Sequence, residues 1–71
     1  MDPYQSLANT IVLQAAKDYR DALKKLKRNP SYASALSTKN ECERFFRSAW
    51  YEILTSVDGE LLMEKLQAEV A

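Results

Sequence analysis

The fold is decided by residues 3–28, PYQSLANTIVLQAAKDYRDALKKLKR, which contain no glycine and have a proline only at their first position. Apolar residues recur in this stretch at steps of three and four, the spacing of one face of an α-helix. They are Tyr4, Ala8, Ile11, Ala15, Tyr19, Ala22 and Leu26. Asp2 before Pro3 is typical of a helix start, because proline lacks the N–H that would have no partner there, and Gln5 strengthens this cap. The first breaker is Asn29-Pro30, so we predict one long helix over residues 3–28, about 39 Å in length.

Two shorter helices are expected after a connection over residues 29–37. Thr38 followed by Glu41 has the form of a capping box, and it predicts a second helix over about residues 39–55. The segment Ser56-Val57-Asp58-Gly59 interrupts the pattern, and Asp58 is placed to cap a third helix over about residues 59–70. We therefore predict an all-α, three-helix architecture and a single helical domain over residues 1–71.

Composition excludes several classes of function. The 71 residues contain ten basic and ten acidic side chains, no histidine and one cysteine, Cys42. One cysteine permits no internal disulfide, and no paired cysteines, glycine-rich phosphate loop or nucleophile with an adjacent base is visible. We therefore expect no enzyme, no cofactor and no metal. No apolar run approaches the roughly 18 residues of a membrane span and the start does not resemble a secretion signal, so we expect a cytoplasmic protein without a membrane segment.

The apolar faces of the predicted helices are unusually wide. On residues 39–55 the arc covers about 180°, against roughly 100° for a simple amphipathic helix, and the arc of the first helix is similarly broad. The first helix is also longer than the other two, which would measure about 25 Å and 18 Å. The mismatch favours a homodimer. A monomer whose later helices lie in series along the first, and a complex with a different protein, remain open.

A basic ridge is predicted on the first helix, opposite its apolar face. Its members fall within about 100° of one another on the helical wheel, and they are Lys17, Arg20, Lys24, Lys27 and Arg28. Such a ridge can follow a phosphate backbone or meet an acidic protein surface. It can equally be a solvated face, because the helix dipole favours cations near a C-terminus. The last helix carries Glu60, Glu64 and Glu69 against Lys65 alone, which argues against its reading DNA, so nucleic acid is not the favoured partner.

A second candidate surface lies on residues 39–55. Tyr51 falls outside the predicted apolar arc, between Arg44 and Arg47, and we expect it to be exposed as part of a protein interface, where tyrosine and arginine are common anchors. Phe46 and Trp50 are four residues apart on the predicted buried arc and are expected in the core. Aromatic residues interleaved with arginines are also found in proteins that bind single strands.

Several segments carry a resemblance to a known group. They are residues 11–20, IVLQAAKDYR, residues 23–30, LKKLKRNP, residues 43–48, ERFFRS, and further on Trp50-Tyr51, Leu54-Thr55 and Asp58-Gly59-Glu60. In these segments the chain resembles small uncharacterised helical proteins encoded by phages and prophages of Gram-positive bacteria. The resemblance implies a phage accessory protein in the cytoplasm of the bacterial host and carries over no functional residue.

Together these observations predict a non-catalytic protein–protein interaction module. Its partner would be an unknown host or phage protein, which it inhibits or recruits as an adaptor. The alternatives are an accessory factor that binds nucleic acid through the basic ridge, and a small structural component of the virion.

Overall fold

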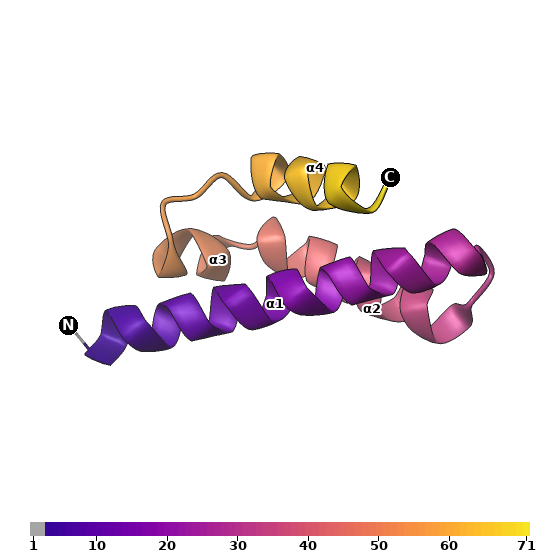
Figure 1. The fold of residues 1–71 in the computed structure, drawn as a ribbon. Helices are drawn as coiled ribbons and strands as arrows, with labels where there is room; N and C mark the ends of the chain where they lie inside the picture. Colours follow the sequence, from indigo (N-terminus) through magenta and orange to yellow (C-terminus); the bar gives the residue numbers. More distant parts are fainter. Residues whose placement is uncertain (1–2) are drawn as a thin grey trace.

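The protein is built from helices that pack around one long helix. A computed structural model describes the backbone of residues 3–71 and the side chains from Ser6 onward, and within these residues there is no strand. The helices are α1 (Pro3–Arg28), α2 (Ala33–Phe46), α3 (Ala49–Leu54) and α4 (Gly59–Val70) (Figure 1). The all-α class and the bounds of α1 and α4 are confirmed, whereas the predicted count of three helices is wrong. The predicted cap by Asp2 and the side chains of Tyr4 and Gln5 lie outside the described residues.

Helix α1 sets the long dimension of a molecule that measures 41 × 21 × 20 Å. Helix α2 runs back along the C-terminal half of α1, and α3 continues beside its N-terminal half (Figure 1). Helix α4 then returns toward the C-terminal end of α1, so that α2, α3 and α4 all contact α1 (Figure 1). The shorter helices therefore follow α1 in series, which lets one chain cover most of its length.

The connection after α1 is shorter than predicted, because Asn29 organises it locally. The Asn29 side-chain oxygen accepts hydrogen bonds from the backbone N–H and the hydroxyl of Ser31, at 3.3 and 3.1 Å. The Asn29 carbonyl accepts a third from the N–H of Tyr32, at 3.1 Å. An asparagine that bonds to backbone two residues on is a common turn device. Helix α2 then begins at Ala33, so the predicted start near residue 39 is wrong, and Thr38 lies inside the helix.

The predicted helix over residues 39–55 is broken at Arg47 and Ser48. The Ser48 N–H donates to the carbonyl of Phe45 at 3.0 Å, three residues back, which tightens and ends α2. The Ser48 hydroxyl also donates to that carbonyl at 2.6 Å and accepts from the N–H of Tyr51 at 3.2 Å. Serine competes in this way with the helical ladder and favours caps. One side chain therefore ends α2 and starts α3.

Helix α4 begins with the predicted cap. A carboxylate oxygen of Asp58 accepts from the N–H groups of Glu60 and Leu61, at 2.9 and 3.2 Å. The next residue, Gly59, lies against the last turn of α2, and a Cβ at this position would collide with the carbonyl oxygen of Phe46. Glycine is therefore required here for close approach, and it places the start of α4 directly on the end of α2.

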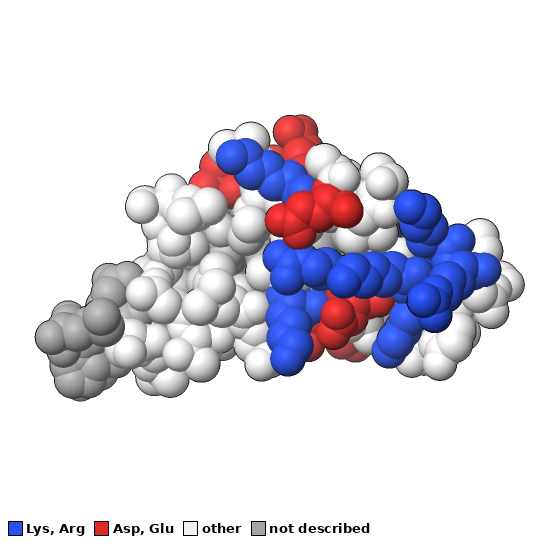
Figure 2. Space-filling view, in the orientation of Figure 1, with Lys and Arg blue, Asp and Glu red and all other residues white. Residues whose placement is uncertain are grey.

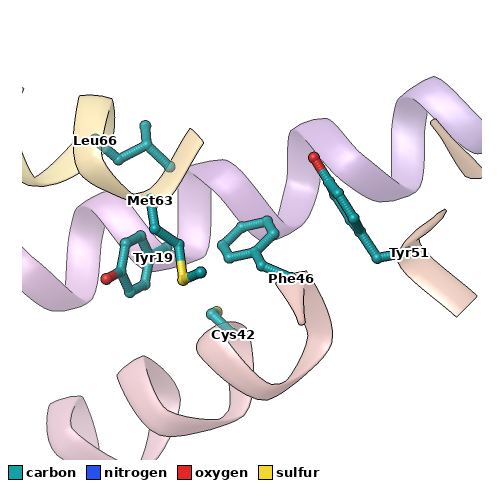
Figure 3. Close-up of a cluster of buried hydrophobic side chains, with 6 residues drawn as sticks. All are labelled: Tyr19, Cys42, Phe46, Tyr51, Met63 and Leu66. Atoms are coloured by element: carbon teal, nitrogen blue, oxygen red, sulfur yellow. The ribbon is translucent and has the colours of Figure 1, made fainter. Parts of the chain in front are cut away.

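The core is assembled from all four helices. Figure 3 shows Tyr19 from α1, Cys42 and Phe46 from α2, Tyr51 from α3, and Met63 and Leu66 from α4. The Phe46 ring meets the rings of Tyr19 and Tyr51 edge to face, with centroids 5.6 and 5.7 Å apart. Such aromatic pairs add about 0.5–1.5 kcal/mol each beyond the area they bury. Phe46 is therefore the centre of the core.

One polar network joins three helices at the edge of this core. The Tyr19 hydroxyl donates to a carboxylate oxygen of Glu43 and accepts from the side-chain amide of Gln67, both at 2.8 Å. The Lys39 ammonium lies 2.9 Å from the same carboxylate. Burial acts to raise the pKa of Glu43, but the bonds from Lys39 and Tyr19 outweigh it and leave that pKa below its ordinary value. Burial, chiefly, raises the pKa of the Tyr19 hydroxyl.

Candidate protein interface

The predicted cluster of Arg44, Arg47 and Tyr51 does not exist as one surface. Tyr51 is 1% exposed and lies in the core, so its predicted exposure is wrong. Arg47 instead reaches α4, where its Nε lies 2.7 Å from a carboxylate oxygen of Glu60, and this bond raises the pKa of its guanidinium. Arg47 also pairs with Glu43, four residues back on the chain, at a longer distance of 3.9 Å. Only Arg44 remains as an exposed side chain with no ion pair among the described residues.

Trp50, which the sequence predicts in the core, is exposed on α3 instead. It is 55% exposed, so its assignment to the core is wrong, and Ile53 in the next turn is 81% exposed. The break at Ser48 explains why Tyr51 is buried and Trp50 is exposed, because it changes the direction of the chain just before Trp50. In a continuous helix Trp50 would follow Phe46 on the same face. After the break Tyr51 fills the core and Trp50 points outward.

Trp50 and Ile53 belong to a larger apolar surface that includes the first half of α1. Leu7, at 60% exposure, and Ile11 are four residues apart and share a face of α1. Ile11, Phe45 and Trp50 line one shallow groove between α1 and α3. We define the apolar surface as Leu7, Ile11, Phe45, Trp50 and Ile53. Exposed aromatic and aliphatic side chains that are grouped in this way mark interaction sites more often than scattered ones do.

The apolar surface has relief. The Trp50 indole stands edge to face on the Phe45 ring, with centroids 5.6 Å apart, and forms a ridge. On one side lies the groove of about 430 Å³ whose α1 wall runs from Thr10 to Asp18. On the other side lies a second groove of about 320 Å³, lined by Glu41, Arg44 and Ser48 beside the two rings. A ridge between two hollows is a shape that another protein surface can interlock with.

Charge is separated along the molecule. Residues 3–16 contain no charged side chain, whereas residues 17–28 carry six basic and two acidic ones. Figure 2 shows the consequence, with charged side chains gathered around the C-terminal half of α1 and over α4, and an uncharged surface toward the N-terminal end of α1. The part of the apolar surface on α1 thus lies in a stretch without charged side chains to desolvate.

Two of the five side chains predicted to form the basic ridge make contacts within the molecule. The Arg20 Nε lies 2.8 Å from a carboxylate oxygen of Glu69. The Lys27 ammonium donates to the carbonyl of Val70 at 3.0 Å, at the end of α4. These two cations therefore hold α4 against α1, and only Lys17, Lys24 and Arg28 make no hydrogen bond or ion pair with the described residues.

The one cysteine is poorly placed for chemistry. Cys42 is buried in the core, and burial, together with the nearby carboxylates of Asp18, Glu41 and Glu43, raises the pKa of its thiol. A raised pKa lowers the fraction of reactive thiolate. Across residues 6–71, no group of three or more acidic or cysteine side chains is arranged to hold a metal ion. None of the described helices combines the length and hydropathy that a membrane span needs.

Comparison with known proteins adds no relative. No family model matches the sequence, and no curated protein or solved structure is significantly similar to it. The candidate interface therefore depends on the geometry and on one signal in the sequence. This signal is the absence of charge from residues 3–16, a stretch in which Leu7 is 60% exposed.

Proposed function

We propose that the chain is a non-catalytic protein-interaction module that docks through the apolar surface. The observation that carries the proposal is the exposed Trp50, held on Phe45 between two grooves in a region without charge on α1. Tryptophan is among the residues most enriched at binding hot spots. A small domain gains nothing in stability from leaving an indole in water, so a binding partner accounts for it best.

A protein partner fits this surface better than nucleic acid does. Docking onto phosphates would use the basic ridge, two of whose five members are engaged with α4. Glu69 also lies beside Arg20 and reduces the local positive field. The apolar surface, in contrast, offers no cations on α1 for a phosphate backbone. In the phage setting that the sequence resemblance implies, docking would inhibit a larger host or phage protein or link it to another one.

Site-specific photo-crosslinking in the producing cell tests the proposal. The photoreactive residue p-benzoylphenylalanine replaces Ile53, which is 81% exposed and whose side chain contributes little to the core. The control carries it at Leu36, an exposed residue on α2 at the opposite end of α1. We expect protein adducts from position 53 and few from position 36. Absence of adducts from position 53, or equal yields from both, would refute docking through the apolar surface.

A further inference from the structure

We propose that the occupant of the apolar surface is a second copy of this chain, bound about a two-fold axis so that the Trp50 ridge of each copy enters the Thr10–Asp18 groove of the other. This inference deepens the proposed function and rests on it, because it names the partner of the same surface. Three independent observations on the molecule support it: its exposed area, its charge and its relief.

The first observation is an excess of exposed area. The chain exposes 5133 Å², whereas a folded monomer of 8.1 kDa is expected to expose about 4,500 Å² from the scaling of area with mass. The excess is about 600 Å², close to the roughly 800 Å² that each partner buries in a standard interface. One contact of standard size between copies would remove an area of this order from each chain.

The second observation is the charge. In a two-fold interface each side chain meets the surface of an identical copy, so charges near the axis oppose their like. The first half of α1 carries no charge. Among the described residues, the one carboxylate that lines the groove belongs to Asp18, at the C-terminal end of its α1 wall. It accepts a hydrogen bond from the Gln14 side-chain amide at 2.9 Å. The formal net charge of the chain is zero, so no overall repulsion opposes association.

The third observation is the relief, which is self-complementary. A surface that presents one ridge beside one hollow can pair with an identical surface turned by 180°, because each ridge then faces the hollow of the other copy. The groove of about 430 Å³ lies within the range of about 300–1,000 Å³ found for small-ligand pockets, which is ample for an indole. By helical spacing, Leu7 lies one turn before Ile11 and Ile53 one turn after Trp50, so both would border this contact.

Trp50 is the single tryptophan of the chain, so its fluorescence reports the interface without a label. We expect sedimentation equilibrium between about 5 and 500 μM to give a mass that rises toward twice 8.1 kDa. Over the same range the Trp50 emission should shift to shorter wavelength and acrylamide quenching should fall. Ile53→Glu should stay folded, because Ile53 is exposed, and should raise the dissociation constant by at least about 30-fold, the effect of losing a hot spot. Leu36→Glu places the same charge at the opposite end and should leave association unchanged.

The outcomes separate this inference from the proposed function. A measured mass of 8.1 kDa at every concentration, with the same acrylamide quenching of Trp50 throughout, would refute binding of a second copy. Self-association that Ile53→Glu leaves intact also overturns it, because the contact then lies elsewhere. If crosslinking from position 53 yields only adducts heavier than a dimer, docking through the apolar surface holds while the second copy fails. If it yields none, both fail.

Discussion

Two of the described tyrosines, Tyr19 and Tyr51, are buried, and we expect the same substitution to have opposite effects on stability at these two positions. Tyr19 and Tyr51 are 0% and 1% exposed, and replacing either with phenylalanine removes only a hydroxyl. The Tyr19 hydroxyl makes two hydrogen bonds of 2.8 Å, one of them to a carboxylate. The Tyr51 hydroxyl is buried with no hydrogen-bond partner among the described residues. We therefore expect Tyr19→Phe to destabilise the fold and Tyr51→Phe to stabilise it.

The magnitudes follow from these bonds. A neutral hydrogen bond contributes about 0.5–1.5 kcal/mol and one to a charged group about 1.5–3 kcal/mol, so Tyr19→Phe should lower the free energy of unfolding by about 2–4 kcal/mol. A 71-residue domain has only about 4–10 kcal/mol in total. The change should lower Tm by about 8–32 °C. Tyr51→Phe removes a polar group that was buried without a bond, and should raise the free energy of unfolding by about 1 kcal/mol.

Urea unfolding followed by circular dichroism at pH 7 measures both variants. The protein should be at low micromolar concentration, because association would add to the apparent stability. The reasoning is refuted if both variants shift the midpoint in the same direction, or if Tyr19→Phe costs less than about 0.5 kcal/mol, a size typical of ordinary surface substitutions.

The same network predicts a pH dependence. The pKa of Glu43 is lowered in the folded protein, so its contribution is present above the unfolded value of about 4.3 and is lost as pH falls through the folded pKa. The difference in stability between the wild type and Tyr19→Phe should therefore shrink below about pH 4. The pKa of Tyr19 is raised, so its neutral form stabilises the fold below about pH 10, and that contribution is lost as pH rises through the folded pKa.

Three further predictions concern single positions. Gly59→Ala should destabilise the fold by about 1–3 kcal/mol, because a Cβ would collide with the Phe46 carbonyl. This cost should exceed the roughly 1 kcal/mol by which alanine is the better helix former, so a rise in Tm in a thermal melt would contradict the close approach. Trp50→Ala should cost well under the 3–5 kcal/mol of a core aromatic at low protein concentration, because the indole is half exposed, and a full loss of folding would place it in the core after all. The Cys42 thiol should react with a thiol reagent at least about 100-fold more slowly than in guanidinium, because the buried group is reached only when the fold opens; equal rates would exclude its burial.

The ends of the fold could be predicted from the sequence because local residues decide them. Helix α1 is bounded by Pro3 and by Asn29-Pro30, and α4 by Asp58-Gly59. Each of these acts through its own backbone or through a neighbour within three residues, as the bonds from Asp58 show. Local signals of this kind are enough to set a helix end where no distant contact overrides them. The approximate bounds predicted for both helices therefore agree with the structure.

The middle of the chain could not be predicted in the same way, because its local signals are misleading. Thr38 with Glu41 has the form of a helix start but lies inside α2, and Ser48 ends α2 although it lies within an apparently continuous apolar pattern. Packing between distant residues determines where α2 ends. Gly59 brings α4 onto the carbonyl of Phe46, and α2 ends at that residue. Periodicity alone carries no information about such a contact between distant residues.

The break at Ser48 also determines which surface the protein presents. Had the helix continued, the rings of Phe46 and Trp50 would lie four residues apart on one face, and both would face α1. The Ser48 hydroxyl holds the Phe45 carbonyl at 2.6 Å and caps α3 through Tyr51, so the core receives Tyr51, whose hydroxyl gains no partner there among the described residues. A fold selected for stability alone would place the indole inside and leave the polar phenol outside, because the indole is the larger apolar group. The chain does the reverse, and the cost is a buried hydroxyl without a bond. This arrangement leaves Trp50 exposed beside the uncharged half of α1, which is why the apolar surface is better explained by binding than by incomplete packing.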